Sequence, residues 1–148
     1  MNLPRYTLSS DIHQETFEFI SEGVKGKIHK LIQFTPTNLK NIYNLAFGDK
    51  DLKTGKIDDL VVSNNGDSEK VLATVVSAIY VFSDKNKDTM IYVTGSTESR
   101  TRLYRIGINK YLEEVNSDFD IFGELKDSWE LFQKDKDYVG YLLVRKIN

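Results

Sequence analysis

The residues of this chain that are best suited to chemistry lie together in segment 94–105, where a predicted strand ends and a predicted helix begins. The first N–H groups of a helix lack intrahelical partners, and the helix dipole adds partial positive charge, so anions bind well there. Gly95 lets the backbone approach a ligand closely, and Arg100 can hold a phosphate or carboxylate through two parallel hydrogen bonds. With three hydroxyl donors nearby, the segment predicts a site for an anionic group, formed by Gly95, Ser96, Thr97, Ser99 and Arg100.

A purely structural interpretation of the same segment stays open. Ser96 or Thr97 would be an ordinary helix N-cap, which needs no ligand. Glu98 and Arg102 lie four residues apart, the spacing of a solvent-exposed ion pair on a helix. Arg100 is harder to explain in this way. Helical geometry turns it toward the apolar side of the helix, where a guanidinium needs a buried partner or a bound anion.

Charge is segregated along the chain although its sum is small. The 148 residues carry a formal net charge of −2. Residues 97–111 contain four basic side chains and one acidic side chain, whereas residues 113–137 contain nine acidic and three basic ones. Arg102 and Arg105 form a secondary basic face of the predicted helix, and Arg105 can also pair with the acidic segment. Because no global positive field results, the sequence argues against nucleic-acid binding.

Few other residues offer a catalytic or metal-binding constellation. The chain has no cysteine, which excludes disulfides, thiol catalysis and the common structural zinc sites. Its two histidines, His13 and His29, are not at metal-ligand spacing. Segment 84–88 has the first positions of a calcium loop but lacks the turn glycine and the bidentate glutamate. We therefore assign no catalytic residue, and we expect no metal site and no cofactor.

The sequence Gly-Ser-Thr-Glu-Ser-Arg-Thr-Arg-Leu-Tyr-Arg at residues 95–105 also carries a resemblance. It resembles the signature of an uncharacterised family of small bacterial proteins, found mostly in Bacteroidetes. The similarity runs over most of the chain, from the first predicted hairpin to the last predicted strand. Because the function of that family is unknown, the resemblance implies no activity and no catalytic residue.

The first half of the chain is typical of antiparallel strands. Alternating apolar residues predict strands over 16–19, 28–34 and 43–47. Gly23 and Gly26 enclose two residues, the pattern of a hairpin, and Pro36 ends the second strand because proline cannot donate a ladder hydrogen bond.

The second half mixes helices and strands. The spacing of Leu72, Val75 and Ile79 predicts a helix that begins near Asp67. A buried strand is expected over 89–94, then a helix over 97–115 (with a strand over 103–109 as the alternative), then strands over 119–125 and 138–145. Between those last strands, Trp129 is expected in a turn or a short helix.

This order predicts an α+β fold with a mainly antiparallel sheet and two principal helices packed chiefly on one face. The length favours a single globular domain over residues 1–148, with residues 1–13 as a loose N-terminal arm. The first residues lack the apolar region of a secretory signal, and the most apolar window, residues 71–82, is too short to span a bilayer. We expect a cytoplasmic protein with no membrane contact.

The leading functional hypothesis is a small intracellular binding or interaction module. Its expected contacts are a protein partner or a second copy of the chain, together with a small anionic ligand at the predicted site. Most aromatic residues are expected in the core because of their period-two spacing. As the alternative, four that lie beside acidic residues would form an interface patch: Trp129, Phe132, Tyr138 and Tyr141. An enzyme that acts on a phosphorylated or nucleotide substrate is the alternative. A nucleic-acid-binding protein, using Arg100, Arg102, Arg105 and Lys110, is the weakest alternative.

Overall fold

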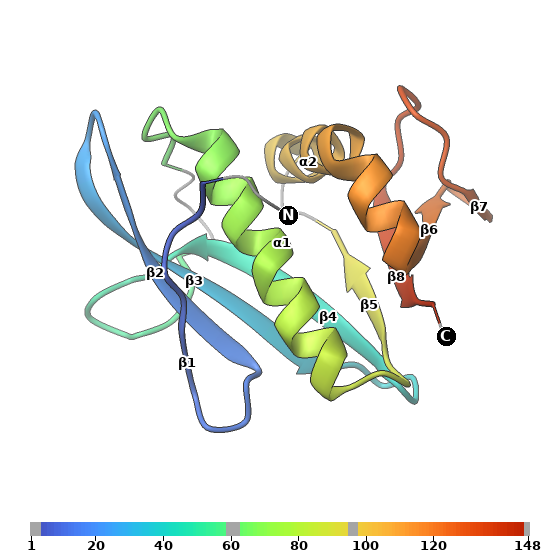
Figure 1. Ribbon diagram of the computed structural model, residues 1–148, viewed down its shortest axis with the longest axis horizontal. Helices are drawn as coiled ribbons and strands as arrows, with labels where there is room; N and C mark the ends of the chain where they lie inside the picture. Colours follow the sequence, from blue (N-terminus) through green and yellow to red (C-terminus); the bar gives the residue numbers. More distant parts are fainter. Residues whose placement is uncertain (1–3, 59–62, 95–97, 147–148) are drawn as a thin grey trace. The chain divides into compact units, whose positions relative to one another are not determined.

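The computed structural model describes residues 4–58, 63–94 and 98–146, and it has eight strands and two long helices in this part of the chain (Figure 1). The elements follow one another as β1 (Ser9–Ser10), β2 (Thr16–Gly23), β3 (Gly26–Pro36), β4 (Ile42–Asp49), α1 (Ser68–Lys85), β5 (Met90–Val93), α2 (Glu98–Asp118), β6 (Phe119–Glu124), β7 (Trp129–Leu131) and β8 (Gly140–Arg145). The strand order in the sheet is β1-β2-β3-β4-β5-β8-β6-β7. The predicted α+β class with a mainly antiparallel sheet is confirmed.

The chain divides into two compact units, which we describe separately. The first unit comprises Met1–Phe34 and Ala46–Lys85, and the second comprises Thr35–Leu45 and Asn86–Asn148. Strand β4 contributes its last residues to the first unit and its first residues to the second.

The first unit is built on the β2–β3 hairpin. Its strands pair antiparallel from Thr16↔Gln33 to Gly23↔Gly26, and Gly26, which directly follows the two-residue turn, has a positive φ of 86°, a conformation that glycine adopts without strain. The hairpin predicted between the two glycines is therefore confirmed.

Helix α1 covers one face of this hairpin (Figure 1). The alternation of β2 buries Phe17 and Phe19 on that face, as the sequence pattern predicts. The rings of Phe34 and Phe82 stack 4.2 Å apart and join β3 to the helix. Burial of these rings, together with the largely aliphatic buried face of α1, supplies most of the free energy that holds the helix on the sheet.

The second unit contains the parallel strand pair of the fold. Residues Ile42 to Leu45 of β4 pair with Met90 to Val93 of β5, and the chain connects the two strands through α1. A parallel pair needs such a crossover. The pairs β5–β8, β8–β6 and β6–β7 are antiparallel, and α2 packs against β6 with Tyr111 and Val115 buried.

Two expectations about the second half are settled by these elements. The helix expected over 97–115 is confirmed as α2, so the alternative strand over 103–109 is wrong. The turn or short helix expected around Trp129 is also wrong, because Trp129–Leu131 is a strand that pairs with β6. Its three residues are too few to show a clear alternation in the sequence, and the pairing partner defines the strand.

A buried ion pair holds β3 to the end of β4 in the first unit. The Lys30 ammonium donates to the Asp49 carboxylate and, at 3.1 Å, to the carbonyl of Ser63. Only 4% of Lys30 and 7% of Asp49 are exposed. Asp49 is thus a buried residue at the end of β4. Burial of one charge without the other would be very costly, so the two residues depend on each other.

Replacement of Lys30 tests this dependence. We expect Lys30→Met to lower the free energy of unfolding by about 3–5 kcal/mol, because it leaves the Asp49 carboxylate buried without a cation. The double variant Lys30→Met/Asp49→Leu should recover most of this loss. Urea unfolding followed by circular dichroism measures both. A double variant at least as unstable as Lys30→Met would contradict the proposed dependence.

Candidate functional site

The site predicted from the sequence lies mostly outside the described residues. Gly95, Ser96 and Thr97 belong to the part of the chain that is not described. Ser99 and Arg100 lie in the first turn of α2, where the sequence analysis placed them. The anion site at the start of α2 therefore stays a prediction.

The secondary basic face of α2 is only partly free. Arg102 is exposed to solvent. Arg105 is partly buried and forms an ion pair with Asp137, in the acidic segment that follows the helix. The structural interpretation of Arg105 is thus supported, since its charge is already balanced within the second unit.

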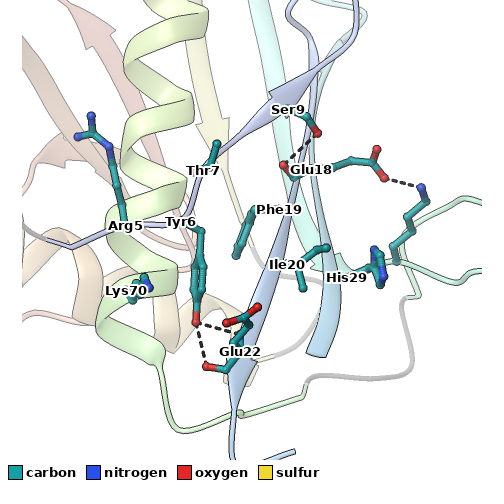
Figure 2. Close-up of a pocket in the computed structure, with 11 residues that line it drawn as sticks. Arg5, Tyr6, Thr7, Ser9, Glu18, Phe19, Ile20, Glu22, His29 and Lys70 are labelled. Atoms are coloured by element: carbon teal, nitrogen blue, oxygen red, sulfur yellow. Dashed lines mark hydrogen bonds and ion pairs between the residues drawn. The ribbon is translucent and has the colours of Figure 1, made fainter. Parts of the chain in front are cut away.

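The first unit contains a pocket that the sequence analysis did not find (Figure 2). Its volume is about 640 Å³, within the range of small-molecule sites. It lies between the N-terminal segment and strand β2, and its lining combines charged and apolar side chains: Arg5, Tyr6, Thr7, Ser9, Glu18, Phe19, Ile20, Glu22, His29, Lys50 and Lys70.

Tyr6 forms the centre of this pocket and is held from several sides. Its ring stacks on Phe19 with the centroids 5.5 Å apart, and the Lys70 ammonium lies 4.2 Å from the centroid of the same ring. The phenol lies 2.5 Å from the Asp67 carboxylate, and it accepts the N–H of Glu22 at 3.0 Å (Figure 2 shows the Glu22 contact). Burial, and next the bond to Asp67, raise the pKa of Tyr6. Tyr6 is therefore a neutral, fixed wall of the pocket.

Asp67 joins this wall to the start of α1. The carboxylate also accepts the hydroxyl of Ser21 at 2.5 Å, and the Tyr6 N–H donates to the hydroxyl of Thr74 on α1 at 2.8 Å. In the segment that the sequence predicted as an arm, Tyr6 is thus bonded to both β2 and α1.

The cations of the pocket differ in whether their charge is balanced. Lys50 forms an ion pair with Glu18. Lys70 has no carboxylate partner among the residues the structure describes, and its ammonium faces the Tyr6 ring instead. Arg5 extends away from Tyr6 (Figure 2). Lys70 is therefore the pocket cation best placed to meet an anionic ligand.

A second polar cluster lies in the second unit, around Tyr92. The Tyr92 hydroxyl donates to Glu124 at 2.6 Å. Gly140 lies beside this hydrogen bond, and a larger residue there would collide with both groups. Tyr141 is fully buried, and its hydroxyl has no hydrogen-bond partner in the described part of the chain.

The pKa values of these two tyrosines argue against a role as a base or a nucleophile. Burial, and next the bond to Glu124, raise the pKa of Tyr92 to about 12. Burial raises the pKa of Tyr141 to about 12 as well, against a smaller opposite effect of the Arg105 charge. At neutral pH both phenols stay protonated, so neither is an activated base or nucleophile.

The aromatic interface that the sequence left as an alternative is not a surface patch as a whole. Tyr138 and Tyr141 are buried, and Phe132 is half-buried against both rings. Trp129 alone of the four is exposed, at 46%. The acidic neighbours led to the wrong interpretation because they alternate with core residues along β6. Glu130 bonds to Lys136 and Tyr138, so it is not free for a partner.

The missed pocket residues left only weak signals in the sequence. Tyr6 is the one aromatic residue of the polar first 13 residues. Lys70 is the third residue of α1, where the helix dipole disfavours a cation. Neither signal indicates that the two side chains meet, because 64 positions of sequence numbering separate them and only the tertiary fold joins them.

With the fold and pocket defined, comparison with known proteins assigns the chain to a family. Residues 2–146 match the family of unknown function DUF6934, so the chain belongs to that family. The resemblance noted from the sequence is confirmed at this level, while a bacterial origin stays a prediction. No curated protein matches the chain. No solved structure matches it either.

Two further properties concern the class of protein. Neither α1 nor the described residues of α2 are long and apolar enough to cross a bilayer. Over the ranges 4–58, 63–94 and 98–146, no three His, Asp or Glu side chains gather closely enough to hold a metal ion.

Tyrosine variants test the assignments in the second unit. At pH 7 we expect Tyr141→Phe to raise the free energy of unfolding by about 1 kcal/mol, because it removes a buried hydroxyl without a partner. Tyr92→Phe should lower it, because the bond to Glu124 is lost. Since folding raises both pKa values above the ordinary tyrosine value of 10.0, stability should fall as pH rises from 10 toward 12, and less steeply in each variant. Denaturant unfolding at several pH values measures this. Equal destabilisation by the two variants at pH 7 would show that Tyr141 has a partner.

Proposed function

We propose that the protein is a cytoplasmic binding module whose ligand enters the pocket beside Tyr6 and carries a carboxylate or phosphate group. The observation that carries this proposal is the Lys70 ammonium, which lines a pocket of about 640 Å³ without a carboxylate partner in the described residues. The family assignment leaves the activity open, so the proposal rests on this geometry.

The position of Lys70 favours an anionic ligand. The residue lies in the first turn of α1, where the dipole opposes a positive charge and the N–H groups attract a negative one. The Tyr6 ring compensates for part of this cost through its electron-rich face. A bound carboxylate or phosphate would compensate for the rest and would accept a charge-assisted hydrogen bond from Lys70.

The apolar part of the pocket supports binding of a ligand larger than a simple ion. Phe19 and Tyr6 form a stacked pair at the pocket wall, and the Ile20 side chain is 41% exposed beside them. Apolar walls with few fixed polar groups are the usual composition of ligand sites. Tyr6 is already fixed by its hydrogen bonds, so little conformational entropy is lost when a ligand binds.

Binding fits the pocket better than catalysis does. A nucleophile is normally activated by a base within hydrogen-bond distance. Among the described residues that line the pocket, no hydrogen bond joins the His29 imidazole to a hydroxyl or a carboxylate. Glu18 is engaged by Lys50. These contacts support a binding role over the enzymatic alternative.

The start of α2 remains a second location for the same chemistry. Gly95, Ser96, Thr97, Ser99 and Arg100 were predicted to hold an anionic group there, and that site is a proposal of the sequence analysis alone. A single experiment separates the two locations because each depends on a different cation.

Anion titrations of matched variants test the proposal. We expect succinate or inorganic phosphate to raise the melting temperature of the protein at constant ionic strength, and Lys70→Met to weaken the apparent affinity about tenfold. The matched control is Lys87→Met, which removes the same charge from an exposed residue outside the pocket. Arg100→Ala should keep the shift.

The same titration can contradict the proposal. If the shift survives in Lys70→Met and disappears in Arg100→Ala, the anion binds at the start of α2 and the pocket is not its site. If no variant changes the shift, neither location binds the anion specifically.

A further inference from the structure

The edge of strand β2 inside the pocket has backbone groups that face away from the sheet. Gly23 and Gly26 pair across a two-residue turn, so in β2 the odd-numbered residues exchange hydrogen bonds with β3. The even-numbered residues Glu18, Ile20 and Glu22 therefore direct their N–H and C=O groups to the opposite edge. The contact of the Ser9 hydroxyl with the Glu18 carbonyl agrees with this direction.

Ile20 is the residue of this edge that has no partner. Glu18 pairs with Ser9 of β1, and both backbone groups of Glu22 contact the Tyr6 phenol, at 3.0 and 3.1 Å. Between them, nothing in the described part of the chain hydrogen-bonds to the outward N–H and C=O of Ile20. The edge is thus closed on both sides of one residue and open at that residue.

The N-terminal segment explains why the edge is open. Strand β1 is only two residues long, and its register with β2 would bring Thr7 opposite Ile20 if the pairing continued. Instead the chain turns toward α1, where the Tyr6 N–H donates to Thr74. The pocket occupies the gap that this departure leaves beside β2 (Figure 2).

We propose that the ligand of the pocket is an extended peptide segment of a protein partner, which pairs with Ile20 at the β2 edge and places an acidic side chain near Lys70. The inference rests on the proposed function and specifies its ligand. One residue of an extended chain presents its N–H and C=O on the same side, which is the complement of the two groups that Ile20 offers. The exposed Ile20 side chain gives the peptide residue directly opposite it an apolar contact on the same face of the sheet.

The charges of the pocket lysines favour an acidic peptide. Of the pocket lysines, Lys50 is already paired with Glu18, and Lys70 lacks a carboxylate partner in the described residues. A glutamate or aspartate of the partner would form an ion pair with Lys70, as Glu18 does with Lys50. A peptide lysine at the same place would meet an unbalanced like charge, so the pocket should discriminate between the two.

Synthetic peptides test the inference on the unmodified protein. The probe is an acetylated and amidated five-residue peptide with the sequence Thr-Val-Glu-Val-Thr, and its affinity is measured by isothermal titration calorimetry. We expect replacement of the central glutamate by lysine to weaken binding at least about tenfold. N-methylation of each peptide amide in turn should weaken binding about fivefold at the residue that pairs with Ile20 and little at its neighbours.

A protein variant provides an independent arm. Ile20→Pro removes the outward N–H and leaves the β2–β3 hydrogen bonds intact, because proline is tolerated where the N–H faces away from the ladder. It should weaken peptide binding about fivefold, whereas the control Ile20→Val should not. Should Ile20→Pro fail to fold, the N-methylated peptides still decide the question.

The possible results separate this inference from the proposed function. If succinate or phosphate binding depends on Lys70 but no N-methylation affects the peptide, strand pairing is wrong and the anion pocket stands. Failure of the peptide to bind at millimolar concentration overturns the inference in the same way. If light scattering shows a dimer that Ile20→Pro dissociates, the edge is occupied by a second copy, and the peptide-partner inference is overturned.

Discussion

The contact between Tyr6 and Asp67 is the interaction on which the pocket depends. One carboxylate at the start of α1 accepts hydroxyl groups from the N-terminal segment and from β2. Together with the bond from the Tyr6 N–H to Thr74, it holds the N-terminal segment away from β2, where continued β-pairing would otherwise satisfy the same backbone groups. The gap beside β2 is thus a consequence of a polar contact that competes with sheet formation and prevails locally.

In the first unit, the charge of a lysine is balanced more fully the more deeply the lysine is buried. The Lys30–Asp49 pair, which is the most buried, balances both charges within the fold. The half-exposed Lys50–Glu18 pair does the same at the rim of the pocket. The Lys70 ammonium faces the aromatic ring of Tyr6 in place of a carboxylate, and an aromatic face balances the charge of a cation only in part. This difference in charge balance favours the pocket over the surrounding surface as the proposed binding site of an anionic ligand.

Much of the fold could be predicted from the sequence because its elements have strong local signals. The alternation around Phe17 and Phe19, the glycine pair of the hairpin and the periodicity of α1 each specify an element without reference to the rest of the chain. The short strand at Trp129 could not be predicted in this way, because a three-residue edge strand is defined by its partner. The burial of Asp49 could not be predicted locally either, because its partner Lys30 lies 19 positions earlier in the numbering.

The site was harder to predict than the fold. The residues of segment 95–100 drew attention because they are neighbours in the sequence and of suitable type. The pocket instead joins Tyr6, Ile20 and Lys70, which lie in three separate elements and carry no shared motif. These residues share only their proximity to the β2 edge, and that proximity arises once the strand register is set.

The division of β4 between the two units bears on how the chain assembles. Its last residues belong to the unit that ends at Lys85, whereas Ile42 to Leu45 pair with β5, which follows later in the chain. During synthesis the first unit can close as soon as α1 has emerged from the ribosome, because domains fold as units from the N-terminus. Part of one strand then waits with its hydrogen-bonding groups exposed until β5 arrives. In that order of folding, the β5 side of this segment would be an open template for β-pairing until β5 is made.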